Sequence, residues 1–145
     1  MKKKIFAVIL AAVFVLSMAV PAFAAVDEAT GTLKFNENGK FTIMNICDIQ
    51  DTYPMNKTIA QFINEVLDSY QPDLVVLGGD NTVAPEELKE EAVKEICELF
   101  VSNETYFTFV FGNHDREQGY TNEELFLMYK LYGGKYCLAY DADPE

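Results

Sequence analysis

Short apolar runs that stop at turn-forming residues predict five β-strands in this chain. Each run is rich in β-branched or aromatic residues and is followed by Gly, Asn or Asp. The predicted strands cover residues 32–35, 40–47, 73–77, 105–111 and 135–140. Asn38-Gly39 lies between the first two strands and favours a hairpin turn. The second strand is apolar on both faces, which is typical of a strand covered on both sides.

Apolar residues at three- and four-residue spacing predict three amphipathic helices. The first reaches Tyr70 and stops before Pro72, the second begins at Pro85, and the third begins at a capping box, Thr121–Glu124. In the third helix we expect four residues to face inward: Leu125, Met128, Leu131 and Tyr132. The resulting order, β-β-α-β-α-β-α-β, predicts an α/β domain with a largely parallel sheet and right-handed crossovers.

Hard oxygen ligands follow directly after three of the predicted strands. These groups are Asp48-Ile49-Gln50, Gly79-Asp80 and Gly112-Asn113-His114-Asp115. Asp48, Asp80 and Asn113 are separated by 32 and 33 residues, about the length of one βαβ unit. Because the carboxyl ends of parallel strands meet at one edge of a sheet, we expect these side chains to converge. The pattern predicts one metal site shared between strand ends.

These three groups, in this order and at these intervals, resemble the first three signature blocks of the calcineurin-like metallophosphoesterases. The family's blocks are Asp-x-His, Gly-Asp and Gly-Asn-His-Asp/Glu, and the likeness spans residues 41–116. Within the family, the chain looks most like the bacterial exported branch that is similar to purple acid phosphatases. The resemblance implies a four-layer α/β/β/α sandwich around a two-metal site, of which this chain would be the N-terminal portion.

The resemblance also implies a role for each residue of the three blocks. Asp48 would bind the first divalent cation, Asp80 would bridge both cations, and Asn113 would bind the second through its amide oxygen. His114 would contact the phosphate or protonate the leaving oxygen, with Asp115 orienting it. Two cations of manganese, iron, zinc or magnesium would polarise the phosphate and hold a bridging hydroxide for in-line attack.

The chain departs from the family pattern at Gln50 and in its histidine content. Gln50 stands where the family usually has a metal-binding histidine, and its amide oxygen is a weaker ligand than imidazole. Asp51 is either a further ligand to the same cation or a solvated loop acid, and the sequence favours neither. His114 is the only histidine, so the histidines of the family's later blocks, including Gly-His-x-His, are absent. We therefore expect a longer protein to complete the site.

The first 24 residues have the pattern of a secretory signal peptide. Met1–Lys4 is basic, Ile5–Val20 is apolar, and Pro21–Ala24 gives a small-residue cleavage site. A transmembrane anchor is the weaker alternative, because the apolar run is short. We expect cleavage after Ala24, a linker over residues 25–31 and a phosphoesterase domain over residues 32–145. The protein would then be extracellular, in the cell wall or periplasmic.

Charge and cysteine content limit the partners of this chain. It has 23 acidic and 11 basic residues, and cleavage after Ala24 would leave 23 acidic and 8 basic residues, a formal charge of −15. So acidic a chain does not bind nucleic acid or an anionic membrane through a basic surface. Its cysteines, Cys47, Cys97 and Cys137, permit three disulfide pairings, and buried free thiols are the alternative.

The motifs indicate a metal-dependent phosphoester hydrolase whose substrate is a phosphorylated small molecule or a nucleotide. Two alternatives stay open at this point: a non-catalytic exported module that holds a cation, and a degenerate remnant of such an enzyme. Whether the 145 residues are active on their own is a separate question, because the later histidine blocks are absent.

Overall fold

The computed structural model describes residues 26–27, 32–117 and 119–140. The chain divides into two compact units, Met1–Gly39 and Lys40–Glu145. The expected signal peptide and most of the expected linker lie outside the described residues. None of the helices in the described ranges is both long enough and apolar enough to span a bilayer.

The first unit contains a short antiparallel pair of strands. In it β1 (Val26–Asp27) pairs with β2 (Thr32–Leu33), so part of the predicted linker forms a strand. The predicted turn at Asn38-Gly39 is present: Gly39 N donates to Asn36 O at 2.8 Å, and Gly39 has a φ of 69°. The turn does not close the predicted hairpin, because the partner of β2 is β1.

The second unit is built on a parallel sheet of three strands in the order β3-β4-β5. The strands are β3 (Ile43–Ile46), β4 (Leu74–Leu77) and β5 (Phe107–Phe109). Thr42, just before β3, is bonded to the start of β4: its N–H donates to Asp73 Oδ2 at 2.6 Å, and its carbonyl accepts from Asp73 N at 2.9 Å. These bonds join β3 to β4, whereas β2 pairs with β1, so the predicted hairpin between residues 32–35 and 40–47 is wrong.

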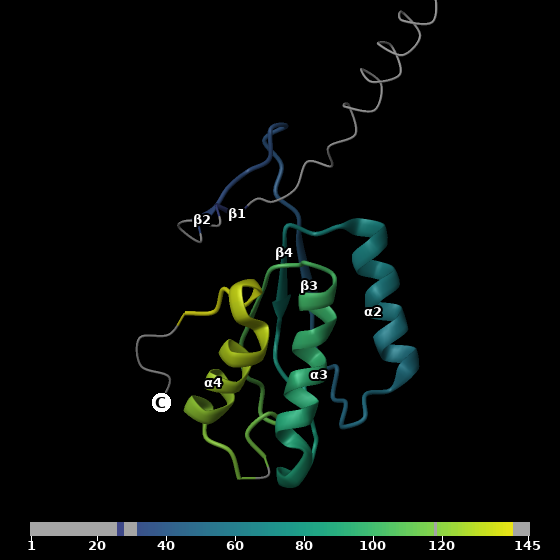
Figure 1. The fold of residues 1–145 in the computed structure, drawn as a ribbon, viewed down its shortest axis with the longest axis vertical. Helices are drawn as coiled ribbons and strands as arrows, with labels where there is room; N and C mark the ends of the chain where they lie inside the picture. Colours follow the sequence, from purple (N-terminus) through teal and green to yellow (C-terminus); the bar gives the residue numbers. More distant parts are fainter. Residues whose placement is uncertain (1–25, 28–31, 118, 141–145) are drawn as a thin grey trace, which may run out of the picture. The chain divides into compact units, whose positions relative to one another are not determined.

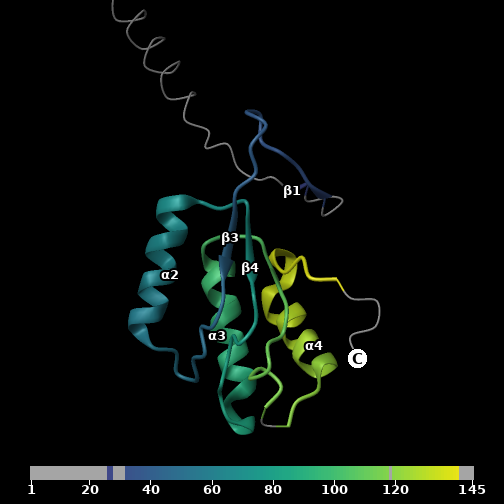
Figure 2. The same cartoon turned by 180° about the vertical axis from the view of Figure 1, so that it is seen from behind.

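The helices of this unit alternate with the strands, as predicted. They are α2 (Lys57–Tyr70), a 3-10 turn η1 (Glu86–Leu88) leading into α3 (Lys89–Ser102), and α4 (Asn122–Gly133). Because the strand order follows the chain order, right-handed crossovers place α2 and α3 on the same face of the sheet. Figures 1 and 2 show the sheet behind α3 and α4 in one view and in front of them in the other. The predicted α/β class is confirmed.

Side chains on the helix-facing side of the sheet form the core. Four of them, on β4 and β5, are buried: Val75, Leu77, Phe107 and Phe109. On the opposite side Ile43 is 59% exposed and Val110 is 55% exposed. Among the described residues of this unit, the helices therefore cover one side of the sheet.

The helix α4 begins as predicted but faces the core differently. Its capping box is confirmed: Glu124 N donates to Thr121 Oγ1 at 3.2 Å, and Thr121 N donates to Glu124 Oε2 at 2.9 Å. Leu125 is buried as expected, whereas Leu131 is 70% exposed. Tyr129, one turn after Leu125, is buried instead, because its ring stacks on Phe109 with centroids 4.4 Å apart.

The last predicted strand is reduced to one bridge. After α4 the chain forms the 3-10 turn η2 (Gly134–Tyr136), and Cys137 then makes a parallel bridge with Phe107. Leu138 N donates to Phe107 O at 2.8 Å. Gly133 explains the tight approach, because a Cβ there would lie 2.6 Å from atoms of both Cys137 and Phe107.

Candidate metal and phosphoester site

The loops that leave the three parallel strands are hydrogen-bonded to one another beyond the sheet. Asp48 N donates to Gly79 O at 3.0 Å, and Gln50 N donates to Asp80 O at 3.0 Å. The ladder between β3 and β4 ends at Ile46 and Leu77, and beyond these loop bonds Asp51 and Thr82 form an isolated parallel bridge. The first two sequence blocks are therefore adjacent at the carboxyl edge of the sheet, as predicted from their spacing.

Two glycines bring the second block into contact with the third. A Cβ on Gly79 would lie 2.8 Å from Gly112 N, and a Cβ on Gly112 would overlap the Asp80 carboxylate. His114 N donates to Asp80 Oδ1 at 2.9 Å. Glycine is required at both positions because the backbones pack without room for a side chain. The three blocks thus form one cluster.

Three residues of this cluster have left-handed backbone conformations. The φ angles of Asp48, Gln50 and Asp80 are 56°, 44° and 51°. Side chains disfavour this region by about 1–2 kcal/mol per residue. Such strain persists only where surrounding bonds hold it, and it concentrates at functional sites. Here the two inter-loop bonds of Asp48 and Gln50 hold it.

Asp115 is buried and binds backbone amides of two loops. Its side chain is 1% exposed. Oδ1 accepts from Asn81 N at 2.8 Å and from Thr82 N at 3.2 Å, and Oδ2 accepts from Gly112 N at 2.8 Å. These bonds all go to backbone amides, and the expectation that Asp115 orients His114 stays a prediction. The carboxylate fixes the loop after β4 against the loop after β5.

The imidazole of His114 is paired with Glu117, a residue that the sequence analysis did not single out. Nδ1 lies 3.0 Å from Glu117 Oε2, and the side chain of His114 is 38% exposed. The hydrogen bond to Glu117 raises the pKa of His114 above its ordinary value, and the charges of Asp80 and Asp115 act in the same direction. The three-residue spacing, with no motif around it, gave no signal for this pair.

Asp51 is a buried acid whose side chain binds backbone amides, so it is not a solvated loop acid. It is 9% exposed. Its Oδ1 accepts from Thr52 N at 2.8 Å, and its Oδ2 accepts from Asn56 N at 2.7 Å. Both oxygens therefore fix the loop that leads into α2. Of the two candidates next to Asp48, Gln50 is the one with an exposed side chain.

The remaining side chains at this edge suit a divalent cation. Asp48, Gln50 and Asn113 are exposed and Asp80 is half-buried, so the set offers two carboxylates and two amides, which are hard oxygen ligands. No group of three His, Cys, Asp or Glu side chains in the described ranges could hold a metal. A cation bound to this set would need further ligands from water or substrate. Asn81 adds a buried Oδ1 that lacks a hydrogen-bond partner in the described structure.

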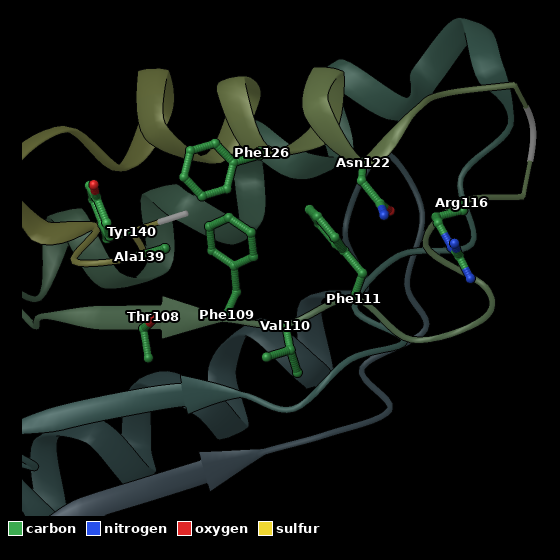
Figure 3. Close-up of a pocket in the computed structure, with 9 residues that line it drawn as sticks. All are labelled: Thr108, Phe109, Val110, Phe111, Arg116, Asn122, Phe126, Ala139 and Tyr140. Carbon is green, nitrogen blue, oxygen red and sulfur yellow. The ribbon is translucent and has the colours of Figure 1, made fainter. Parts of the chain in front are cut away.

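A separate pocket of about 450 Å³ lies between β5 and α4 (Figure 3). The rings of Phe109 and Phe126 lie next to each other there, with centroids 5.7 Å apart and planes tilted by 54°. Arg116 lies at one end of the pocket and Tyr140 at the other. None of the predicted metal ligands lines it. The pocket is thus distinct from the strand-end cluster.

Comparison with known proteins agrees with this geometry. The profile described as calcineurin-like phosphoesterase matches residues 41–142. The chain is 27% identical over 114 residues to "Probable inactive purple acid phosphatase 29" of Arabidopsis thaliana, an alignment that covers 64% of this chain and 28% of the relative. It is 26% identical over 117 residues to "Phosphatase DCR2" of Saccharomyces cerevisiae, covering 69% of this chain and 20% of the relative.

The chain matches no solved structure, and it spans less than a third of the length of either relative. The profile match nevertheless includes β3, β4 and β5 and all three strand-end blocks. The chain belongs to the calcineurin-like phosphoesterase family.

Proposed function

We propose that the strand-end cluster is the metal site of a phosphoester hydrolase that acts on phosphorylated small molecules or nucleotides. The observation that carries this proposal is the contact between the second and third blocks, in which Gly112 abuts Asp80 and His114 N binds Asp80 Oδ1. This contact places a carboxylate and an imidazole-bearing residue together at one sheet edge. Family membership and the phosphatase names of the relatives support the same chemistry.

In this proposal four side chains would hold two divalent cations: Asp48, Gln50, Asp80 and Asn113. When bound, such cations polarise the phosphate and activate the attacking water. Asp80 would lie between them, since it is the acid that contacts both neighbouring blocks. The identity of the cations is open among manganese, iron, zinc and magnesium, which all accept oxygen ligands.

His114 would supply the proton for the leaving oxygen. Glu117 Oε2 accepts a hydrogen bond from His114 Nδ1, and this bond favours the protonated imidazole. The other ring nitrogen, Nε2, takes no part in this bond and would donate the proton. Asp115 would contribute by holding the Gly112 amide against the loop that carries Asp80. In this proposal His114 is the proton donor, and the buried carboxylate of Asp115 fixes the loops.

A non-catalytic cation-binding module is the second candidate. It is favoured by the histidine content, because His114 is the only histidine in the sequence and none of the four proposed ligands is an imidazole. The printed name of the Arabidopsis relative also calls that protein probably inactive. In this case the cluster would bind a cation without turning over a phosphoester.

Hydrolysis of para-nitrophenyl phosphate by the full-length mature protein, from residue 25 onward, separates the two candidates. With manganese present, the first predicts turnover that a chelator abolishes and that His114→Ala lowers by about a hundredfold or more, because general acid catalysis contributes 10²–10⁴-fold. Gln61→Ala, an exposed change on α2, is the control and should keep full activity. Manganese binding without turnover would favour the module. Turnover that survives both the chelator and His114→Ala would overturn the proposal.

We also propose that the protein is exported and cut after Ala24, as in the bacterial exported branch that it resembles. Support comes from the sequence of residues 1–24 alone, with its basic start, apolar run and small-residue site. Intact mass of the protein recovered outside the expressing cells should correspond to a chain beginning at Ala25. A chain that retains Met1 and stays in the cytoplasm would contradict export.

A further inference from the structure

Lys89 is a buried cation in a position that ordinarily disfavours one. It is the first residue of α3, and its side chain is 0% exposed. A positive charge at a helix N-terminus is opposed by the helix dipole, and burial of a charge is costly unless the charge is compensated. Burial lowers the pKa of Lys89, and the negative charge of Asp115 acts in the opposite direction. A lysine kept here needs a compensating partner.

The contacts of Lys89 lie on the two loops that carry Asp80 and Asn113. Its Nζ donates to Thr82 O and to Asp115 O, both at 3.4 Å. Thr82 is in the loop after β4, and Asp115 is in the loop after β5. The Lys89 ammonium therefore links backbone carbonyls of these two loops. The Asp115 carboxylate links backbone amides of the same two loops.

Together Lys89 and Asp115 form a buried network behind the exposed ligand side chains. The Asp115 side chain receives three backbone N–H groups and is 1% exposed. The Thr82 hydroxyl extends the network to the first loop, because it donates to Asp51 O at 2.9 Å. All three strand-end loops are thus connected beneath the cluster, and Lys89 is the network's cation.

We infer that Lys89 is a positioning residue for the metal site: from α3 it holds the loops after β4 and β5 at the separation that brings Asp80 and Asn113 together. The inference rests on the proposed function for its link to metal, but the loop geometry stands independently. Lys89 itself touches no proposed ligand. Its effect passes through Thr82 and Asp115.

Lys89→Met tests this inference, because methionine has a similar length and lacks the charge and the donors. Lys94→Met, on an exposed position of the same helix with its side chain 53% exposed, is the matched control. Hydrogen exchange at the amides of Asn81 and Gly112 reports the loop bonds, and manganese titration followed by electron paramagnetic resonance reports the site. Lys89→Gln, which keeps a polar terminus, replaces Lys89→Met if that variant does not fold.

We expect exchange at these two amides to accelerate about tenfold or more in Lys89→Met while amides within α2 keep their protection. Manganese affinity should fall by about tenfold, which is the lower limit of the effect usually seen when a residue that supports metal ligands is changed. Wild-type protection at both amides, or an equal loss of protection throughout α2, would overturn the inference. If the wild-type chain binds no manganese, the metal site fails, and the exchange result still decides whether Lys89 positions the loops.

Discussion

Four aspartates lie at the carboxyl edge of this sheet. Two of them bind backbone amides, and the other two have accessible carboxylates. Asp51 and Asp115 are buried, and each uses both carboxylate oxygens to accept backbone N–H groups. Asp48 is exposed and Asp80 is half-buried, so their oxygens are accessible to a cation. The sequence could not separate these two kinds, because all four follow apolar strands. The difference depends on which amides the loops present in three dimensions.

Gly112→Ala should damage the site through one methyl group. The added Cβ would overlap Asp80 Oδ1 and lie 2.5 Å from Asp80 N, so the two loops must separate. Overpacking of this kind costs about 1–3 kcal/mol of unfolding free energy, and manganese affinity should fall by about tenfold or more. Urea denaturation and manganese titration measure the two effects.

Gly134→Ala is the control for that experiment. A Cβ there meets nothing within 4 Å, but its φ of 52° makes alanine unfavourable by about 1–2 kcal/mol. Stability should fall while manganese binding is unchanged. Wild-type affinity in Gly112→Ala would show that the loops do not need this close approach.

At the scale of elements, periodicity and capping signals predicted α2, α3, α4 and the three parallel strands. Two predictions depended on competition between partners and were wrong. The turn at Asn38-Gly39 favoured a hairpin, but β2 takes β1 as its partner. The spacing of Leu131 suited an inward position, but the stacking of Tyr129 on Phe109 sets the rotation of α4. Pairing and packing choices of this kind are not encoded locally.

The capping box of α4 should contribute to the unfolding free energy of the protein. Thr121→Ala removes the hydroxyl that accepts from Glu124 N and should lower the unfolding free energy by about 1 kcal/mol. Hydrogen bonds from Thr121 lower the pKa of Glu124 in the folded protein. Their stabilising effect is therefore present above the ordinary carboxyl pKa and is lost as pH falls through the lowered value.

Urea denaturation from neutral to acidic pH checks this prediction. The difference between wild type and Thr121→Ala should shrink at low pH. Thr58→Ala, at the start of α2 and exposed, should change stability by less than half a kilocalorie. The bond from Thr121 N to Glu124 Oε2 survives in the variant, so the pH-dependent part of the difference reports the bond from the Thr121 hydroxyl to Glu124 Oε2. A pH-independent difference would contradict a contribution of that side-chain bond.

At the scale of the whole molecule, the described residues form part of a calcineurin-like phosphoesterase domain. The carboxyl edge of the sheet gathers three sequence blocks, and the helices α2, α3 and α4 support it from one face. Both curated relatives are more than three times as long as the matched part. Sequence spacing was sufficient to predict the cluster, since parallel strands deliver their ends to one edge. It could not predict the network of Asp51, Asp115 and Lys89 beneath it, whose members are scattered along the chain and match no motif.

Manganese binding by Asp80→Asn is the most direct test of the central claim that this cluster is a metal site. Asparagine keeps Oδ1, the acceptor for His114 N, and removes the charge that a bridging ligand needs. Asp68→Asn, an exposed change on α2, makes the same chemical substitution away from the cluster. Wild type and Asp68→Asn should bind manganese equally, and Asp80→Asn should bind it about tenfold more weakly or worse. Equal affinity in all three proteins would contradict the assignment of the site.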